Sequence, residues 1–231
     1  CPTKSAVGGC RGGYHLGQPT VALEIISRTR NAVPAHIPVT VKMRRGLDDS
    51  PASRDRFFEI FDGAFARGVA AVTVHGRTVE QKYIGPSNWD FLREVKQHFQ
   101  SATILGSGDL FTAQDCLRML QVTGVDGVSV ARGAIGNPWI FQQVRAVAAG
   151  QFAPSPAVGE QCRVLNMQYQ LCHEHLPSDR ILATMRMFGI KFAPLHPRAI
   201  AVRDAFARAR TLPEWEQVLD RWYRGDDSHS N

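Results

Sequence analysis

The sequence has 231 residues, of which 44% are hydrophobic and 21% are charged, and this fits one large globular domain or a medium domain with an appendage. No apolar run approaches the roughly 20 residues that cross a bilayer, and no signal-peptide pattern opens the sequence, so we exclude a membrane protein and expect a cytoplasmic one. The net charge of +6 favours an anionic partner such as nucleic acid, although an excess of this size also occurs on ordinary solvated surfaces.

The chain begins with cysteine and proline and has no initiating methionine, so we expect a fragment or a processed chain. Its five cysteines are odd in number and show neither a C-x-x-C pair nor another metal-ligand spacing. This pattern indicates free thiols in a reducing compartment, and we predict no metal site. The cysteines are Cys1, Cys10, Cys116, Cys162 and Cys172.

Four β-rich segments, each followed by a glycine-containing or charged loop, alternate with helical patterns in the first part of the chain. Ser53 and Thr112 occupy helix N-cap positions, and Gly68 and Gly124 stand where helices end. A strand–helix–strand repeat of roughly 30 residues predicts parallel β/α units. The predicted strands cover residues 37–44, 69–77, 102–109 and 124–133, and the predicted helices between them cover 53–68, 89–100 and 112–124.

The loops distinguish an open sheet from a closed barrel, because the β/α units themselves look alike in both. Polar and charged side chains follow every predicted strand, which is the arrangement of a (β/α)8 barrel with its active site in the loops at one face. Four units make half of such a barrel. We therefore predict an α/β fold in which residues 1–150 form the C-terminal half of a TIM (β/α)8 barrel.

A helical region follows residue 150. Residues 151–160 have the proline, serine and glycine content of a linker, and the apolar residues beyond them recur at helical spacing. This predicts a small all-α helical bundle over residues 151–231. Residues 177–211 hold seven Lys or Arg and two Asp, so we expect a basic face on these helices. The predicted helices cover residues 160–176, 180–193, 198–210 and 213–223.

Two glycine-rich loops follow the last two predicted strands, "GSGD" at residues 106–109 and "ARGAIGNPW" at residues 131–139. In barrels, the loops after the seventh and eighth strands commonly hold a phosphate through backbone N–H groups. Arg132 would add a charge-assisted contact to the same phosphate. The alternative is that these glycines make tight turns and nothing more.

Lys42 lies near the carboxyl end of an apolar strand, and His75 ends the next one. Inside a barrel, the Lys42 ammonium would stabilise the negative charge that develops on a reduced flavin, and the His75 imidazole would hydrogen-bond a ring carbonyl of the same cofactor. Gly76 would let backbone and ligand approach closely. The alternatives are a surface lysine at a strand end and a structural histidine.

Cys1 is a candidate proton donor. With an unperturbed pKa of about 8.5, a cysteine is mostly thiol near neutral pH, which suits it to give a proton rather than to attack as a thiolate. A cysteine at a chain terminus is by itself little evidence of a catalytic role.

The motifs together resemble the tRNA-dihydrouridine synthase family, in the right order and at the right separations along the whole chain. That resemblance implies an FMN-dependent TIM-barrel oxidoreductase, reduced by NADPH, that saturates the 5,6 double bond of particular uridines in tRNA. It also implies an FMN-binding catalytic domain over residues 1–150 and a tRNA-binding helical domain over residues 151–231. The motifs are "CPTK" (1–4), "VTVKMR" (39–44), "VTVHGRT" (72–78), "GSGDLF" (106–111), "VARGAIGNPWIF" (130–141) and "MRMFGIKF" (185–192).

By the same resemblance, Cys1 matches the catalytic proton donor, and Lys42 and His75 match residues that line the flavin ring. The residues that match the family's phosphate-side loops are Ser107, Gly108, Asp109, Ala131 and Arg132. The family usually has asparagine at the position of Ser107 and glycine at that of Ala131, and both changes keep a small residue. The family barrel has four strands before the cysteine loop, so we expect this chain to be N-terminally truncated and inactive by itself.

Two other functions stay open. Another FMN-dependent barrel, of the dihydroorotate dehydrogenase or ene-reductase type, would share the flavin residues but has no reason to carry a basic helical domain. A non-catalytic RNA-binding protein would keep the helices without needing Cys1, Lys42 or His75. The presence of all three residues favours the enzyme.

Overall fold

The computed structural model describes residues 3–224, which form two compact units, one ending at Ala131 and one beginning at Arg132. This division comes earlier in the chain than the predicted boundary after residue 150. Helix α6 (Arg132–Gly136) packs against α9 (Ser178–Phe192), where the Gly136 backbone lies so close to that of Lys191 that a side chain on Gly136 would collide with it. Packing of this kind groups α6 with the C-terminal helices.

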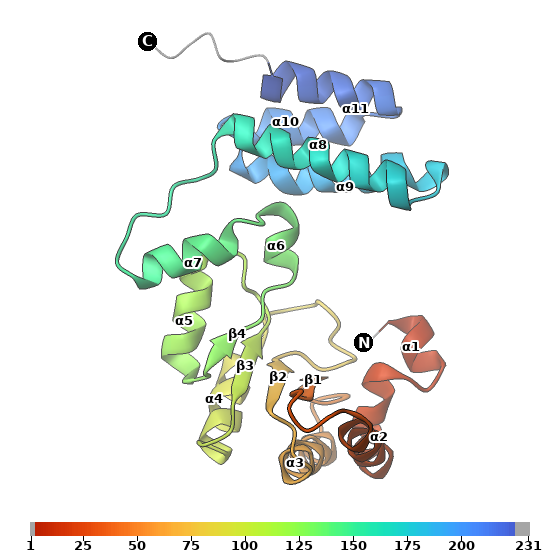
Figure 1. The fold of residues 1–231 in the computed structure, drawn as a ribbon, viewed down its shortest axis with the longest axis vertical. Helices are drawn as coiled ribbons and strands as arrows, with labels where there is room; N and C mark the ends of the chain where they lie inside the picture. Colours follow the sequence, from red (N-terminus) through yellow and green to blue (C-terminus); the bar gives the residue numbers. More distant parts are fainter. Residues whose placement is uncertain (1–2, 225–231) are drawn as a thin grey trace. The chain divides into compact units, whose positions relative to one another are not determined.

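The first unit is an α/β structure built on a four-stranded parallel sheet (Figure 1). The strands stand side by side in sequence order, and one helix connects each strand to the next. The elements are α1 (Lys4–Gly8), η1 (Gly12–Gly17), α2 (Pro19–Ala32), β1 (Thr40–Arg44), α3 (Pro51–Ala66), β2 (Ala71–His75), α4 (Trp89–His98), β3 (Ile104–Ser107), α5 (Ala113–Thr123) and β4 (Gly127–Val128). The parallel β/α units predicted from the sequence are confirmed.

The sheet has one face covered by helices. Right-handed connections that advance in one direction along a sheet place their helices on the same side, and α3, α4 and α5 lie there in Figure 1. The side chains of Val72, Val74 and Ile104 point to this side and are completely buried. The alternate positions of β1 and β2 point to the other face, where Lys42 and Thr73 keep contact with solvent and Arg44 is buried. That second face carries the predicted site.

The structure confirms two of the predicted helix boundaries and corrects a third. Thr112 caps α5 in a reciprocal capping box with Asp115, and Gly124 ends that helix with a left-handed φ of 74°. The prediction of Ser53 as the N-cap of α3 was wrong, because Ser50 holds that position and accepts the backbone N–H of Ser53. A proline follows Ser50 at the first helical position, where the fixed φ of proline starts a helix well.

The last predicted strand is much shorter than expected. Residues 124–133 were predicted as strand, but β4 contains two residues, Gly127–Val128. Gly124 serves as the C-cap of α5 at one end of that range, and Arg132 opens α6 at the other. The pattern of small and β-branched residues was correct for the middle of the segment and could not show that both ends belong to helices.

The described part of the second unit contains helices joined by loops and no strand. Buried side chains from its long helices form one hydrophobic core, in which Leu165, Met185, Val202 and Trp215 come from four different helices. The helices are α6, α7 (Ile140–Ala148), α8 (Val158–His175), α9, η2 (Ala193–Leu195), α10 (Ala199–Arg208), α11 (Leu212–Leu219) and the π-helix η3 (Asp220–Arg224). Across residues 3–224, no helix combines the length and apolarity needed to cross a membrane.

Candidate active site

Lys42, His75 and Ser107 project from the same face of the sheet. The strand register aligns Lys42 with Thr73, Arg44 with His75, and His75 with Ser107. Aligned residues of parallel strands point to one side, as do alternate residues of one strand, so these side chains share the face away from the helices. His75 and Ser107 end their strands, at the carboxyl edge of the sheet where sites of β/α proteins are built.

His75 is an uncharged hydrogen-bond donor near neutral pH. Its pKa is lowered to about 4, first by burial and then by the nearby charges of Arg44, Lys42 and Arg77, while the carboxylate of Asp109 acts in the opposite direction. Its Nδ1 accepts the backbone N–H of Arg77 at 3.2 Å. The neutral ring therefore carries its proton on Nε2, which leaves an N–H group for a carbonyl acceptor.

Lys42 occupies the position on β1 one alternate residue before Arg44, on the same face as His75. Its side chain is exposed, yet the surrounding protein partly desolvates the ammonium, and this burial together with the Arg44 charge lowers its pKa. Its charge in turn contributes to the lowered pKa of His75. The two side chains thus share one face of the sheet and interact through charge.

The turn after β3 offers a backbone donor. Gly108 and Asp109 have positive φ values of 119° and 57°, the first of which suits glycine alone. Gly108 is buried, and the hydrogen bonds of residues 3–224 include none donated by its N–H group. A buried N–H without an acceptor calls for a ligand or an ordered solvent molecule. Ser107 lies beside it and donates its hydroxyl to the Ser129 carbonyl at 3.1 Å.

An ion pair joins the loop after β2 to the turn after β3. The Arg77 guanidinium donates through Nη2 to both carboxylate oxygens of Asp109, each at 2.8 Å, and through Nε and Nη2 to the Gly85 carbonyl at 3.1 and 2.6 Å. Asp109 also accepts the Ser87 backbone N–H at 2.7 Å. The Asp109 carboxylate, predicted on the phosphate side, is therefore engaged in holding the two loops together.

Arg44 anchors the same loop from β1. Its buried guanidinium donates to the carbonyls of Thr78 (2.6 Å) and Lys82 (2.9 Å) and lies over the ring of Tyr83, 5.6 Å from the centroid. From the sequence, Arg44 was one of the functional-looking residues at the strand ends, but it had no specific role. The available signal was its spacing of two residues from Lys42 on one strand, which places both cations on one face.

Gly76 serves packing within the protein. A side chain at this position would come within 2.5 Å of Ser87 Oγ and 2.6 Å of the Asn88 carbonyl oxygen. Because Gly76 has no side chain, the segment just before α4 can pack closely against it. From the sequence, Gly76 was expected to allow the close approach of a ligand instead.

The remaining predicted phosphate-side residues, Ala131 and Arg132, belong to different units. Ala131 is the exposed last residue of the first unit, and Arg132 is the half-buried first residue of the second. Their contact with a phosphate beside Gly108 stays a prediction. Cys1, the predicted proton donor, lies outside the described residues. Within residues 3–224 there is no cluster of three or more His, Cys, Asp or Glu side chains that could hold a metal ion.

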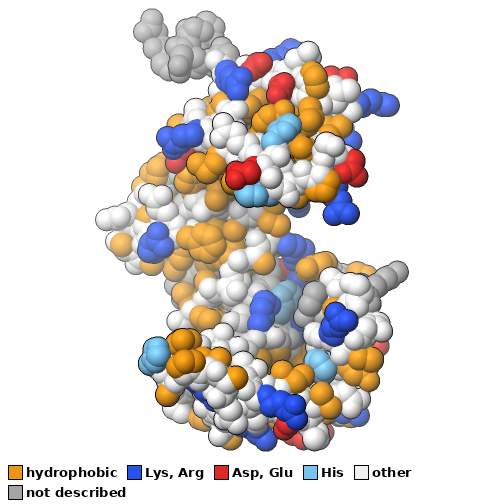
Figure 2. Space-filling view, turned by 45° about the vertical axis from the view of Figure 1, so that its right-hand side comes forward, with side chains coloured by type: hydrophobic (Ala, Val, Ile, Leu, Met, Phe, Trp, Pro, Cys, Tyr) orange, Lys and Arg blue, Asp and Glu red, His pale blue; other side chains and the backbone are white. Residues whose placement is uncertain are grey.

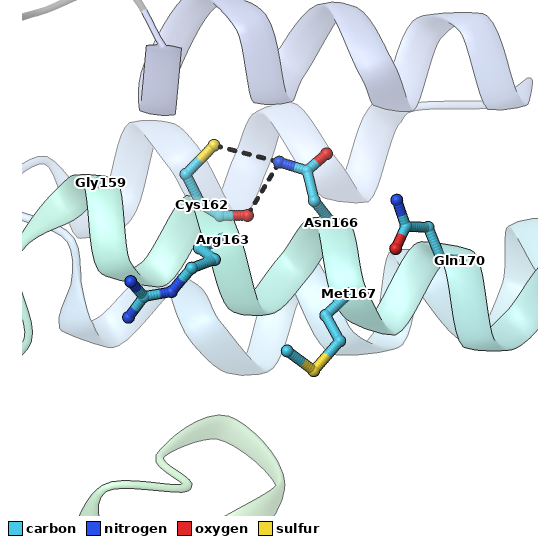
Figure 3. A pocket seen from close by; sticks show the side chains of 6 residues that line it. All are labelled: Gly159, Cys162, Arg163, Asn166, Met167 and Gln170. Carbon is cyan, nitrogen blue, oxygen red and sulfur yellow. Dashed lines mark hydrogen bonds between the residues drawn. The ribbon is translucent and has the colours of Figure 1, made fainter.

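The helical unit has a hollow of about 460 Å³ along α8 (Figure 3). Asn166 points into it and donates its amide to the carbonyl of Cys162 at 3.0 Å and to the thiol at 3.4 Å. The hollow presents one cation and several polar groups, without the paired donors of the sheet. Its lining residues are Gly159, Cys162, Arg163, Asn166, Met167 and Gln170.

The basic residues predicted on the C-terminal helices are mostly at the surface. Arg186 is half-buried and donates to the Ala207 carbonyl at 2.6 Å. The other six are exposed, and Figure 2 shows Lys and Arg side chains spread over the surface among hydrophobic ones. The exposed six are Arg180, Lys191, Arg198, Arg203, Arg208 and Arg210.

Comparison with known protein families gives a match that covers nearly the whole chain. The family model described as dihydrouridine synthase matches residues 1–223. The match therefore includes the sheet with its carboxyl-edge residues, the helices of the second unit and Cys1.

Curated relatives from several bacteria are similar to this chain. A probable tRNA-dihydrouridine synthase of Mycobacterium tuberculosis is 36% identical over 186 residues, which cover 80% of this chain and 47% of the relative. One of Rickettsia prowazekii is 38% identical over 170 residues, covering 73% of this chain and 50% of the relative. One of Rhizobium leguminosarum bv. phaseoli is 39% identical over 139 residues, covering 60% of this chain and 42% of the relative. The chain spans about half the length of these relatives.

Proposed function

Because the chain belongs to the dihydrouridine synthase family, we propose that it forms the part of a tRNA-dihydrouridine synthase that holds FMN and presents a uridine of tRNA for reduction. The observation that carries the proposal is the shared face of the sheet with Lys42, the neutral His75 and the unpaired N–H of Gly108. An ammonium, an uncharged N–H donor and a backbone donor together suit a ligand with a polar ring at one end and a phosphate at the other.

The proposed site residues divide into a ring side and a phosphate side. The Lys42 ammonium would stabilise negative charge at the pyrimidine edge of the ring, and His75 Nε2–H would donate to a ring carbonyl. When bound, FMN reduced by NADPH supplies the hydride that goes to position 6 of the uracil ring. The phosphate side would consist of Ser107, Gly108, Asp109, Ala131 and Arg132, with Asp109 contributing through its backbone because its carboxylate is engaged with Arg77.

Cys1 would complete the reduction as a general acid. Hydride addition at position 6 leaves negative charge on the carbon at position 5, shared with the neighbouring C4 carbonyl, and transfer of the thiol proton to the carbon at position 5 saturates the double bond. The two hydrogens added come from the hydride and from the thiol. This role rests on the sequence match of Cys1 within the family region.

The second unit would bind tRNA. Its exposed cations suit phosphate contacts, which recognise a folded RNA by shape, while the target base is turned out of its stack toward the sheet face. We place the reaction in the cytoplasm with its tRNA substrate.

The four strands would be the C-terminal half of a TIM barrel. Sequential strand order with helices on one face is the arrangement of a (β/α)8 barrel sector, whereas a doubly wound sheet reverses its order and has helices on both faces. Thr40 and Lys42 are exposed on the face that a barrel would enclose. We therefore expect residues 1–231 expressed alone to bind FMN weakly and form no dihydrouridine. A yellow, active preparation of this chain alone would contradict the half-barrel assignment.

The function is tested with the product of the complete gene. We expect it to purify with a flavin absorption spectrum, and tRNA from cells lacking the gene to lose the mass gain of two hydrogens at particular uridines. Lys42→Ala should weaken FMN binding or slow reduction of the flavin by NADPH, whereas Lys191→Ala, a change at an exposed lysine of α9, should do neither. A colourless protein that takes up no added FMN would refute the proposal.

A further inference from the structure

We infer that Arg77 and Asp109 form a positioning pair, which orients the His75 imidazole and fixes the turn after β3 relative to it. The inference rests on the proposed function, because the orientation of His75 matters for a ligand on this face of the sheet. Neither side chain of the pair needs to touch the ligand. Their action would pass through His75 on one side and through the Gly108 turn on the other.

Two neighbours of the imidazole are a residue of this pair and Gly108, which directly precedes the other. The Arg77 backbone N–H donates to His75 Nδ1 at 3.2 Å and thereby keeps the ring proton on Nε2. On the Asp109 side, a Cβ placed on Gly108 would lie 3.4 Å from His75 Cε1, so the ring packs closely against that turn. An ion pair that joins these two segments sets the space in which the ring sits.

The pair is also where three pieces of backbone meet. One guanidinium is bonded to the Asp109 carboxylate and to the Gly85 carbonyl, and the same carboxylate accepts the Ser87 N–H. The Arg77 side chain, at the base of the loop between β2 and α4, therefore bonds to Gly85 near the end of that loop. Movement of Arg77 would release the loop and the N–H that fixes the tautomer of His75.

Burial makes a purely stabilising role a weak explanation. The Arg77 side chain is 4% exposed, and its Nη1 is buried without a partner among residues 3–224. Taking a guanidinium out of water is costly, and a buried ion pair often adds little net stability compared with apolar residues of the same size. A pair that leaves one nitrogen unsatisfied fits better with a requirement for specific geometry.

The test uses Arg77→Lys, which keeps the charge but loses the fork of donors, and Asp109→Asn, which keeps the shape but loses the charge. Arg93→Lys is the matched control. Arg93 also donates Nε to a backbone carbonyl, that of Val122 at 2.7 Å, and also pairs with an aspartate, Asp90 at 2.9 Å, but it lies on α4 away from the carboxyl edge of the sheet. All variants are made in the product of the complete gene.

The first readout is the nitrogen NMR spectrum of the His75 imidazole, assigned by its loss in His75→Gln. We expect the wild-type protein and Arg93→Lys to show protonated Nε2 and unprotonated Nδ1 near neutral pH. Arg77→Lys and Asp109→Asn should show a mixture of the two tautomers. This readout needs no flavin or tRNA, so it stays decisive if the proposed function fails. An unchanged tautomer in both variants would overturn the inference.

The second readout is a double-mutant cycle on the rate of uridine reduction. If the pair acts through His75, Arg77→Lys should slow the wild-type enzyme by about 10- to 100-fold, the range for a small displacement of a catalytic group, and should have little further effect in the His75→Gln background. A pair that only stabilises the fold would give the same factor in both backgrounds, and that result would refute the positioning role. Loss of flavin or activity in the parent protein would count against the proposed function alone.

Discussion

The glycine at position 108 gives a prediction whose magnitude can be worked out from the structure. Replacing it with alanine adds a Cβ at a φ of 119°, a conformation that costs a residue with a side chain about 1–3 kcal/mol. The added carbon would also lie 2.2 Å from Ser87 Oγ and 2.8 Å from Ser87 Cβ, and overpacking of this kind costs about 1–3 kcal/mol more. We expect Gly108→Ala to lower the free energy of unfolding by about 2–6 kcal/mol.

Two other glycines of the first unit separate the two contributions. At Gly124, φ is 74° and the nearest atom to an added Cβ is Lys96 Cγ at 3.9 Å, so Gly124→Ala measures backbone strain alone, about 1–2 kcal/mol. At Gly76, φ is not positive and an added Cβ would lie 2.6 Å from the Asn88 carbonyl oxygen, so Gly76→Ala measures overlap alone, about 1–3 kcal/mol.

Urea unfolding of the three variants in the product of the complete gene, followed by tryptophan fluorescence, gives the differences in free energy. Gly108→Ala should cost more than Gly124→Ala, because it adds overlap with Ser87 to the strain. It should also weaken FMN binding, since the turn carries the unpaired N–H. Equal costs for Gly108→Ala and Gly124→Ala would show that Ser87 does not pack against the turn as described.

Three further predictions concern the proton donor, the RNA contacts and the base of the sheet. Cys1→Ala should leave oxidation of NADPH by the flavin largely intact and slow uridine reduction about 10²- to 10⁴-fold in single-turnover assays, and equal loss of both half-reactions would argue for a structural cysteine. Reversing the charge of Arg203 and Arg208 to glutamate should weaken tRNA binding and flatten its salt dependence in filter-binding assays, and an unchanged slope would move the RNA site elsewhere. Lys96 donates to both oxygens of Asp126 and to two backbone carbonyls. Partial burial raises the pKa of Asp126, but the hydrogen bonds from Lys96 and from the Ile104 N–H, with the Lys96 charge, hold it below its usual value. Because the Asp126 side chain is 41% exposed and solvent screens the pair, Lys96→Met should reduce stability at pH 7 by about 1–2 kcal/mol. A depressed carboxyl pKa contributes stability that is present above the unfolded pKa of about 3.9 and is lost as the pH falls through the folded pKa. The difference in stability between Lys96→Met and wild type should therefore shrink in urea titrations below about pH 4. A difference that stays constant with pH would contradict the ion pair.

The sequence by itself determined the alternation of strands and helices in the first unit. These patterns are local, because the period of hydrophobic residues and the end signals of a helix lie within one segment. Thr112 with Asp115 three residues later, and glycine at 124, define the ends of α5 without reference to the rest of the chain. The position of Lys42 and His75 near the ends of two apolar strands was readable in the same way.

Local signals failed where two neighbouring residues could serve one role. Ser50 and Ser53 are both good N-cap residues, and the first caps α3 while the second accepts the N–H groups of Leu47 and Asp48. Helix α2, between Pro19 and Ala32, was not predicted. In the structure it packs against α3 and η1.

The tertiary structure alone decided what the side chains at the sheet edge do. Register between strands, which no single segment contains, places Lys42, His75 and Ser107 on one face. The partner of Arg77 lies 32 positions away in the chain, and the pairing commits the Asp109 carboxylate to the protein's own loops. Such contacts depend on how separate strands come together in space, and the physical reason they escape a sequence pattern is that their energy comes from burial and geometry that exist after the chain has folded.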